Sequence, residues 1–393
     1  MPAPLEGIRI LDFTRFQQGP YATVMLSDMG AEVIKVEEPG QGDLGRALGA
    51  EPDGFSDYFE AYNRNKRSIT LNLRSEEGRA IVHKLAARVD VVVENFRPGV
   101  MDRLGIGYAA LSAINPRIIV ASASGAGQRG PLARKPSFDV IGQAMSGAMW
   151  AQAGGPPNEP QSIAEGFADQ VGAMYLAWGV AMALIARERY GVGQYVDSSL
   201  LSGQIGFFSR SYVRSLAAGR AHYLVPGRSP LFRAYRCADD RWLALGILDP
   251  KVWPRLCRAI EREDLIEDPR FATPHDRHEH LADLYRVLRD VFASRGRDEW
   301  LQRLEAHDVA CGPVRDFIEV AADPHVIENE YIVTVEHPRR GPMREPGVPV
   351  RLSRTPGRVR STAPELGQHT EEVLRELGYS WEEIEQLRIK GVI

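Results

Sequence analysis

The sequence predicts an α/β protein whose first 200 residues build a mostly parallel sheet. Short runs rich in β-branched residues alternate there with segments of helical periodicity, and this alternation is typical of βαβ units. The chain has 393 residues, more than one hydrophobic core usually organises, so we expect two domains. Its net charge is −4, without the basic bias of a nucleic-acid-binding protein.

The elements expected in the first half follow one another in a regular order. Helices are expected at 20–29 and 75–87, and residues 195–200 end a strand that leads into a helix over 201–218. The five earlier strands are expected at Ile8–Phe13, Glu32–Glu37, Ser68–Leu73, Val89–Glu94 and Arg117–Ser122.

The second half begins with a change of composition near residues 218–232, where Pro226-Gly227-Arg228-Ser229-Pro230 indicates a turn-rich boundary. A new unit opens at the expected strand Trp242–Gly246 and ends near Cys311-Gly-Pro-Val314. Helices are expected within it near 280–293 and 297–307, and Pro-rich residues 320–365 lead back to two short closing helices at 370–377 and 381–387.

Three features bear on the compartment of the protein. The cysteines Cys237, Cys257 and Cys311 are scattered, which fits a reducing cytosol better than a disulfide framework or a zinc site. The N-terminus lacks the cationic and apolar segments of a signal peptide. The most apolar window, 171–186, is short and rich in Gly and Ala for a membrane span. We therefore expect a cytoplasmic enzyme that binds neither nucleic acid nor a membrane.

Asp169 is the first candidate for a functional residue. It lies shortly before the apolar run Met174–Ala186, at the expected entrance of a buried helix. The positive end of a helix favours an ionised acid, and a partly desolvated carboxylate can act as a nucleophile. Position alone favours a helix N-cap, which is the commoner role of such an acid.

The end of the first strand is a second candidate region, because ligands of open α/β sheets bind beyond the carboxyl ends of the strands. Residues 16–19 are placed to line such a site. The Gly-x-Gly-x-x-Gly fingerprint is missing there, so we expect no NAD, although Glu37 resembles a ribose-binding acid. The His275–His280 run sits on a surface-type helix without cysteine, so we also expect no metal.

An ordered set of motifs, rather than any single one, resembles the class III CoA-transferase family, which also contains α-methylacyl-CoA racemase. The resemblance extends over nearly the whole chain and closes at Leu366–Thr370. The motifs are Leu11-Asp-Phe13, Gly19-Pro20, Gly30–Glu37, Asn63–Ile69, Val93–Gly99, Ser124–Gln128, Gly193–Asp197 and Cys311–Val314.

This resemblance implies a Rossmann-like large domain with a parallel sheet, a smaller inserted α+β domain, and two chains threaded through each other as an interlocked homodimer. The expected divisions are a CoA-binding domain at 1–200, a linker at 201–224, a small domain at 225–319, a return linker at 320–355, and C-terminal helices at 356–393 that pack on the large domain.

The resemblance also implies the chemistry. The family nucleophile is an aspartate in an Ala-Asp-x-x-Gly context, and Ala168-Asp169-Gln-Val-Gly172 matches it. CoA would pass from an acyl-CoA donor to a carboxylic acid acceptor, by way of an aspartyl anhydride and an aspartyl-CoA thioester, without metal or NAD. Coenzyme A is thus both substrate and part of the covalent intermediate.

The CoA contacts implied by the resemblance come from several loops. Phe16, Gln17 and Gln18 would lie near the pantetheine end, and Asn95 and Phe96 near the nucleotide. In the same matching, Leu71 and Arg74 flank the adenine, Arg103 meets a phosphate, and Asp139 helps to fix the thioester end.

Departures from the family pattern limit what the resemblance implies. Glu38 stands where relatives often carry a basic residue, and the glycine-run loop of formyl-CoA transferase is missing. Phe138 occupies the position of the racemase histidine, so a racemase or epimerase is the alternative that this residue disfavours. A non-catalytic CoA-binding protein is the second alternative. Arg228, Arg233 and Arg236 are candidates to bind a second carboxylate of the acceptor.

Overall fold

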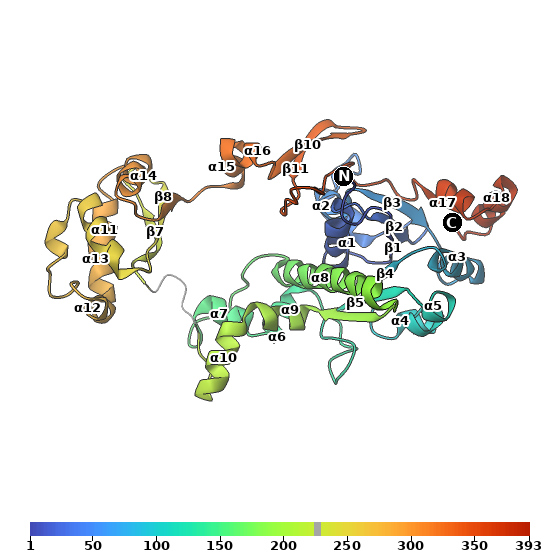
Figure 1. The fold of residues 1–393 in the computed structure, drawn as a ribbon, viewed down its shortest axis with the longest axis horizontal. Coiled ribbons are helices and arrows are strands. Elements are labelled where there is room, and N and C mark those ends of the chain that lie inside the picture. Colours follow the sequence, from blue (N-terminus) through green and yellow to red (C-terminus); the bar gives the residue numbers. More distant parts are fainter. Residues whose placement is uncertain (224–228) are drawn as a thin grey trace. The chain divides into compact units, whose positions relative to one another are not determined.

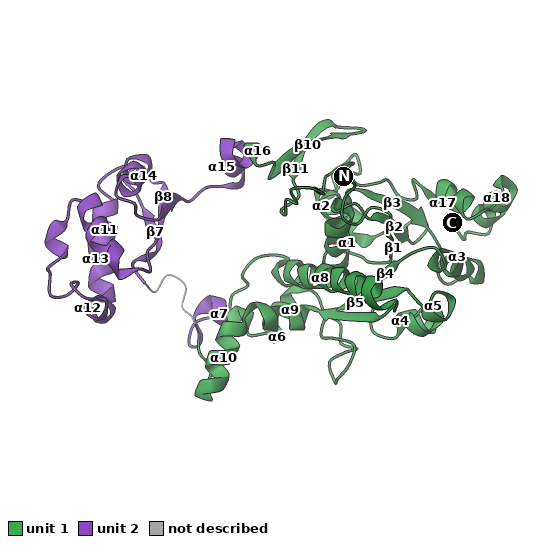
Figure 2. Ribbon diagram, viewed as in Figure 1, with its two compact units in different colours: residues 1–150, 159–222, 327–393 green, residues 151–158, 223–326 purple. Residues whose placement is uncertain are grey.

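The computed structural model describes residues 1–223 and 229–393, and the chain in it forms two compact units (Figures 1 and 2). The larger unit contains residues 1–150, 159–222 and 327–393, and the smaller one contains residues 151–158 and 223–326. The expected turn at Pro226–Arg228, including Arg228, lies outside the described residues. The domain boundaries expected from the sequence remain predictions.

A six-stranded sheet forms the centre of the larger unit. All neighbouring strands are parallel, and their order is β3-β2-β1-β4-β5-β6, which is the order of a Rossmann-type sheet. The predicted α/β class is therefore confirmed. The strands are β1 (Arg9–Asp12), β2 (Glu32–Glu37), β3 (Lys66–Thr70), β4 (Val91–Glu94), β5 (Ile119–Ser124) and β6 (Tyr195–Ser199).

One of these strands begins earlier than we predicted. We expected it over Ser68–Leu73, but β3 ends at Thr70, because the chain turns at Asn72, whose carbonyl accepts a hydrogen bond from the Ser75 N–H. Leu71 still packs in the core, so its apolar character mimics one further strand residue.

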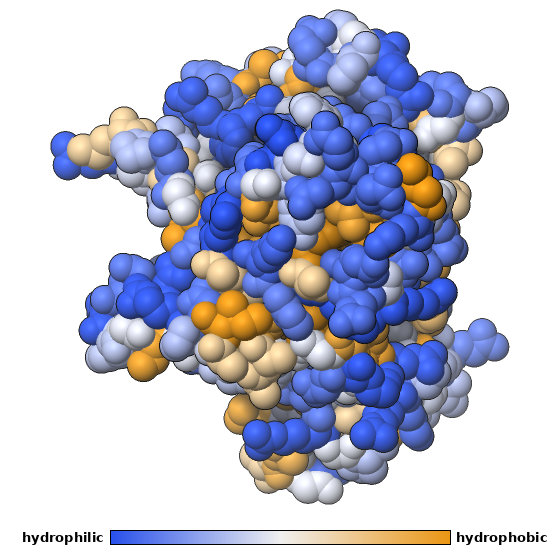
Figure 3. Space-filling view, turned by 90° about the vertical axis from the view of Figure 1, so that its right-hand side faces the viewer, coloured by the Kyte–Doolittle hydropathy of each residue, from blue (hydrophilic) through white to orange (hydrophobic). Residues whose placement is uncertain are grey.

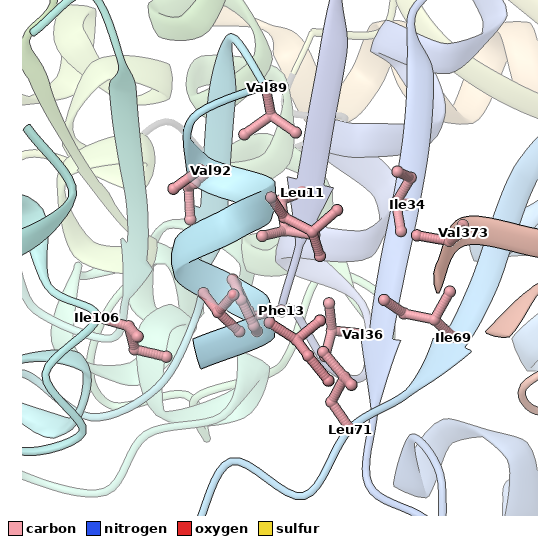
Figure 4. Close-up of a cluster of buried hydrophobic side chains, with 14 of the residues drawn as sticks. Leu11, Phe13, Ile34, Val36, Ile69, Leu71, Val89, Val92, Ile106 and Val373 are labelled. Atoms are coloured by element: carbon pink, nitrogen blue, oxygen red, sulfur yellow. The ribbon is translucent and has the colours of Figure 1, made fainter. Parts of the chain in front are cut away.

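Both faces of the sheet are buried, and alternate residues of each strand point to opposite faces. Leu11, Ile34 and Val92 pack with helices α3, α5, α17 (Thr370–Glu376) and α18 (Trp381–Ile389) (Figure 4). Ile10, Val33 and Val93 instead pack with α1 and α8. The helices of the larger unit's first half are α1 (Gln18–Asp28), α2 (Asp57–Asn63), α3 (Glu76–Ala86), α4 (Val100–Arg103), α5 (Tyr108–Ile114) and α6 (Asp139–Met145), with a 3-10 turn η1 (Leu44–Ala47). Helix α7 (Ala148–Ala153) begins in the larger unit, and its residues 151–153 belong to the smaller one.

Helix α8 (Phe167–Tyr190) is the longest helix among the described residues. Gly166 and Gly191 flank it, and both adopt the left-handed conformation that glycine tolerates at helix ends. Its length and apolar composition would suffice to cross a membrane, yet half of its apolar window is buried inside the protein. One of its faces packs on α1 and on the sheet through small residues such as Ala173 and Ala177.

The segments expected to link the domains have structure of their own. Residues 201–224 hold most of α9 (Leu200–Phe207) and α10 (Ser209–Ala218), so the single helix predicted over 201–218 is interrupted at Phe208. Residues 320–355 include the end of α15 (Phe317–Ala322), α16 (Pro324–Glu328) and an antiparallel hairpin of β10 (Ile332–His337) and β11 (Gly341–Pro346).

The chain then returns to the sheet of the larger unit. Helices α17 (Thr370–Glu376) and α18 (Trp381–Ile389) cover the core beside β3, where Thr370 Oγ1 accepts a hydrogen bond from the Thr70 N–H. Arg67 of β3 forms ion pairs with Glu372 and Glu376. The face with α17, α18 and α3, turned toward the viewer in Figure 3, is mainly hydrophilic with small apolar patches.

The smaller unit is an α+β assembly with its own core. An antiparallel sheet of β7 (Phe232–Arg236), β8 (Trp242–Gly246) and β9 (Cys311–Pro313) packs against helices through residues such as Trp300, Phe292 and Tyr235. Its helices between β8 and β9 are α11 (Trp253–Ala259), α12 (Pro274–Glu279), α13 (Leu281–Phe292) and α14 (Arg297–Ala306), with 3-10 turns η2 (Pro250–Val252) and η3 (Glu263–Leu265), and α15 follows β9.

Candidate active site

A pocket of about 410 Å³ lies beyond the carboxyl ends of β1, β4 and β5, entirely within the larger unit. This is the edge of a doubly wound sheet at which ligands bind. The pocket brings together six residues that the sequence predicted for the site: Phe16, Gln17, Gln18, Asn95, Phe96 and Asp169. The remaining lining residues are Arg15, Arg97, Pro98, Ala123, Ser124, Gly125, Ala133, Lys135, Pro136, Ser137, Phe138 and Leu200.

Asp169 is the third residue of α8, inside its first turn, and the N-cap position belongs to Gly166. The N-cap alternative for Asp169 is therefore wrong. Gly166 has no side chain that could cap the helix, and a residue from α6 does so instead. Asp139 Oδ1 accepts hydrogen bonds from the backbone N–H groups of Ala168 (2.6 Å) and Asp169 (3.2 Å).

The carboxyl group of Asp169 is mostly buried, and burial followed by the nearby charge of Asp139 raises its pKa to about 7. We expected the helix N-terminus to favour the ionised acid. Burial and then the charge of Asp139 outweigh that effect, and Asp139 also binds two of the N–H groups at the positive end of the helix. Once ionised, such a carboxylate is more basic and less hydrated than an ordinary aspartate.

Two glycines allow the glutamines of the β1–α1 loop to approach α8. A Cβ atom at Gly166 would lie 2.1 Å from Gln17 Nε2, and one at Gly172 would lie 2.5 Å from Gln18 Nε2. Gln17 Nε2 donates a long hydrogen bond to the Gly166 carbonyl (3.4 Å). Gln18 Nε2 is buried without a hydrogen-bond partner. Both amides thus lie against the helix turn that carries Asp169.

The β1–α1 loop is held in a strained conformation. Phe16 has φ +64°, which a residue with a side chain rarely adopts, and its N–H donates to Asp43 Oδ1 (3.1 Å). The Asn95 side chain accepts a hydrogen bond from the Arg15 N–H (2.9 Å) and donates one to the Arg15 carbonyl (2.7 Å). The amide of Asn95, predicted to contact the nucleotide, is therefore engaged in fixing this loop.

Buried charges lie beneath the same loop. Lys35 Nζ binds Asp43 Oδ2 (2.8 Å) and the Thr14 carbonyl, and Lys66 Nζ binds Asp12 Oδ2 (3.0 Å). Burial opposes the ionisation of Asp12, but Lys66, Lys35 and two threonine hydroxyls overcome this and lower its pKa to about 2. Burial lowers the pKa of Lys66 to about 8, against the attraction of Asp12. The loop thus rests on paired charges without solvent contact.

Four of the predicted site residues do not line this pocket. Leu71 is 1% exposed as a whole residue and its side chain belongs to the hydrophobic core (Figure 4), so the structure does not present it to a nucleotide. The Arg74 side chain is 85% exposed and lies 3.7 Å from Glu38, and Arg103 is exposed at the end of α4. Asp139 acts through the backbone of α8.

Three cations line the pocket that the sequence analysis did not select: Arg15, Arg97 and Lys135. Arg15 and Arg97 directly adjoin residues that we did select, and their charge beside a strand end is the signal that would have identified them. Lys135 lies in the long segment between β5 and α6, where no motif marks it. Arg15 also lies over the Phe96 ring, 5.2 Å from its centroid.

Phe138 forms part of the pocket wall and meets Phe16 edge-on, with 5.8 Å between ring centroids. Among the described residues that line this pocket, none is a histidine. In the chain as described, 1–223 and 229–393, no group of His, Cys, Asp and Glu is arranged to hold a metal ion.

Arg233 and Arg236, two of the candidates for a second carboxylate, lie in the smaller unit. Arg233 stacks over the Tyr285 ring, 3.9 Å from its centroid, and Arg236 pairs with Asp240. Both cations thus already have partners in their own unit.

Comparisons with a family model, with related sequences and with solved structures each match nearly the whole chain. The sequence model of CoA-transferase family III matches residues 5–370. A succinyl-CoA–D-citramalate CoA-transferase of Chloroflexus aurantiacus is 36% identical over 398 residues, covering 100% of this chain and 98% of the relative. The succinyl-CoA:glutarate CoA-transferase of Mus musculus is 36% identical and covers 99% and 90%. The crystal structure of a CAIB/BAIF family protein from Brucella suis has a TM-score of 0.86 at 32% identity, covering 96% and 100%.

Proposed function

The chain belongs to CoA-transferase family III, and from this membership we propose that it transfers CoA by a covalent route in which Asp169 is the nucleophile. The protein is an enzyme of this class, and CoA-transferases act on an acyl-CoA donor and a carboxylate acceptor. One observation carries the proposal: among the described residues that line the pocket, Asp169 is the one carboxylate.

In the proposed first half-reaction, an Asp169 oxygen attacks the thioester carbonyl of the donor, which gives a mixed anhydride and releases CoA thiolate. The thiolate then attacks the aspartyl carbonyl, and the donor acid leaves as its carboxylate. The enzyme now holds CoA as an aspartyl thioester. The acceptor carboxylate reverses these steps and leaves as its CoA thioester. Each step exchanges one acyl bond for another, so charge and atoms balance without ATP.

The geometry around Asp169 supports this route. Burial strips water from the carboxylate and raises its pKa, so that the ionised form is strongly nucleophilic. The aspartyl anhydride and thioester are prone to hydrolysis, and a water-poor pocket protects them. Arg15, Arg97 and Lys135 would hold the phosphates of CoA at the same pocket.

The presence of Phe138 in the pocket wall argues against a racemase activity at this site. A racemase must remove a proton from one face of the α-carbon and return it on the other, which requires two bases. Phenylalanine cannot carry a proton, and Asp169 alone supplies one base in this pocket. We therefore assign group transfer rather than proton transfer to Asp169.

The relatives suggest the class of acids. The two named above are a succinyl-CoA–D-citramalate and a succinyl-CoA:glutarate CoA-transferase, so succinyl-CoA is the first donor to test and dicarboxylic acids the first acceptors. We expect dicarboxylates to accept CoA about tenfold faster than monocarboxylates of equal length, because the acceptors named for both relatives are dicarboxylic acids and a second carboxylate can bind a cation outside those used for CoA. Equal rates in an acceptor screen would contradict a dicarboxylate preference while leaving the transferase assignment intact.

The covalent step has a direct test by intact-protein mass spectrometry. Incubation with succinyl-CoA and no acceptor is expected to add the mass of CoA to the chain, and hydroxylamine is expected to remove it. Peptide mapping should place the adduct on Asp169. Full turnover without any adduct, even after rapid quenching, would contradict the covalent route.

We further propose that the chain works as a homodimer, interlocked as in its family. Along α8, Met174, Trp178, Met182 and Ile185 form an apolar stripe that is half-exposed in the single chain. The stripe recurs every three to four residues on one helix face, opposite the face packed on the sheet. Light scattering is expected to give twice the chain mass of 43.6 kDa, and a monomer of full activity would contradict the proposal.

A further inference from the structure

The connection between α6 and the start of α8 is held by one buried glutamine. The Gln143 side chain is 1% exposed, and all its hydrogen bonds stay inside the protein. Its Nε2 donates to Asp139 Oδ2 (2.7 Å) and to the Ala164 carbonyl (2.8 Å), while its Oε1 accepts from the Ile163 N–H (2.9 Å). Gln143 therefore ties Asp139 to the segment that enters α8.

The two carboxylate oxygens of Asp139 accept hydrogen bonds from different parts of the chain. Oδ2 accepts the hydrogen bond from Gln143, and Oδ1 accepts those from the N–H groups of Ala168 and Asp169. The carboxylate of Asp139 is thus fixed from one side by Gln143 and on the other side binds the backbone of the reacting residue. A cap supplied by another helix replaces the local cap that Gly166 cannot provide.

We propose that Asp139 and Gln143 are positioning residues for Asp169: together they fix the first turn of α8 and place a negative charge behind the reacting carboxyl group. This inference rests on the proposed role of Asp169 and assigns to Asp139 a function other than contact with the thioester. Gln143 does not line the pocket, so it acts on Asp169 through Asp139 and through the backbone of residues 163 and 164.

The surroundings of Asp169 decide how strongly this charge acts. Ionisable groups near it are Asp139 from α6, Tyr58 and Tyr62 from α2, and Glu165 from the preceding loop. Burial raises the pKa of both tyrosines, and Asp169 raises it further, so they remain neutral. The cations Arg15, Arg97 and Lys135 line the same pocket. Of these groups, Asp139 is the one hydrogen-bonded to the Asp169 backbone.

Asp139→Asn removes the negative charge. Asparagine keeps an oxygen that accepts from the Ala168 and Asp169 N–H groups, but its Nδ2 replaces Oδ2 and cannot accept the hydrogen bond from Gln143. Gln143→Leu removes that same hydrogen bond and keeps the charge, so the difference between the titrations of the two variants isolates the effect of the charge. The pKa of Asp169 is expected to fall by about one pH unit when a neighbouring like charge is removed. A less basic nucleophile reacts more slowly, so adduct formation at pH 8.5 is expected to fall about threefold by Brønsted behaviour.

Gln143→Leu tests the contribution of the Gln143 side-chain hydrogen bonds. Leucine has nearly the volume of glutamine but cannot form hydrogen bonds with Asp139, Ile163 or Ala164. We expect adduct formation at pH 8.5 to slow about tenfold, since misplacement of a reacting group by a fraction of an ångström has effects of this size.

Glu165→Gln is the matched control for Asp139→Asn. It also removes a carboxylate, four residues before Asp169, but this carboxylate has no hydrogen bond to the first turn of α8.

The decisive measurement needs no substrate. The full-length protein is labelled with ¹³C at the aspartate carboxyl carbons, and the Asp169 signal is assigned by its loss in Asp169→Asn. Wild type and Glu165→Gln are expected to titrate near pH 7, and Asp139→Asn about one pH unit lower. An unchanged titration in Asp139→Asn, or wild-type adduct rates in Gln143→Leu, would overturn the inference. Because the titration is independent of turnover, it stands even if Asp169 proves not to be the nucleophile.

Discussion

Asp169→Asn is expected to lose turnover by a factor of about 10⁴ or more, the size of effect seen when a covalent nucleophile is removed. No CoA adduct should form, because an amide nitrogen does not replace the carboxylate oxygen in the anhydride step. Asparagine has nearly the same shape, so binding of the acyl-CoA should persist. Initial rates with succinyl-CoA and a dicarboxylate, together with binding measured by calorimetry, separate the two effects.

The same substitution is expected to stabilise the folded chain in alkaline solution. The pKa of the Asp169 carboxyl is about 7 in the folded protein and near 3.8 in an unfolded chain, so folding favours the protonated form. Its contribution to stability is complete below pH 3.8 and is lost as the pH rises through 7. Asparagine cannot ionise, and the variant should exceed wild type at pH 8.5 by about 2 kcal/mol or more, since one pKa unit corresponds to about 1.4 kcal/mol.

Urea unfolding at pH 5 and pH 8.5 measures this difference, which should grow with pH. Asp308→Asn serves as the control, because Asp308 lies in the smaller unit and its side chain is 89% exposed. It should change neither turnover nor the pH dependence of stability. Retained turnover in Asp169→Asn would contradict the proposed chemistry. Lower stability of that variant at pH 8.5 would contradict the conclusion that ionisation of Asp169 destabilises the folded protein.

Asp12→Asn is expected to be the most destabilising single change considered for the larger unit. Asp12 is completely buried and neutralises Lys66, which has no exposure to water either. Asparagine leaves a buried ammonium group without a counter-charge, and breaking such a pair costs about 3 to 5 kcal/mol. Because the pKa of Asp12 is about 2, the stabilising effect of this pair should persist down to pH 4 in wild type.

A double-mutant cycle with Lys66→Met distinguishes the pair from the loss of packing. If the charges are coupled, Asp12→Asn with Lys66→Met should be more stable than Asp12→Asn alone, although both positions have changed. Free energies of unfolding from urea titrations at pH 7 give the coupling. Additive losses would mean that Asp12 acts through its hydrogen bonds to Thr14 and Thr23 and not through Lys66.

The parallel sheet could be predicted from the sequence, because strands buried on both faces appear as short continuous runs of β-branched residues. The resemblance to the family also assigned Asp169 and the loop after β1 to one CoA site, and the structure places both at one pocket. It could not show the cap from Asp139 or the clamp of Asn95 on Arg15, because residues 29 to 80 positions apart form these hydrogen bonds. Local propensity carries no information about such pairs.

The pKa of Asp169 is a second property that the local sequence did not predict correctly. A residue at a helix N-terminus is normally expected to be a stronger acid. Two features reverse that expectation: the burial of the carboxyl group and the negative charge of Asp139, which is hydrogen-bonded to the same helix turn. Both depend on how α6 packs beside α8, which no short stretch of sequence encodes.

The path of the chain between β5 and β6 has a consequence for how this scaffold diversifies. Asp169, Phe138 and Lys135 all belong to that one crossover, whereas Gln17 and Asn95 follow β1 and β4. Exchange of the crossover in evolution or by grafting would therefore replace the proposed nucleophile and one wall of the pocket together, while the edge formed by β1 and β4 stays intact. New acid specificities can arise in this way as a single transplanted module.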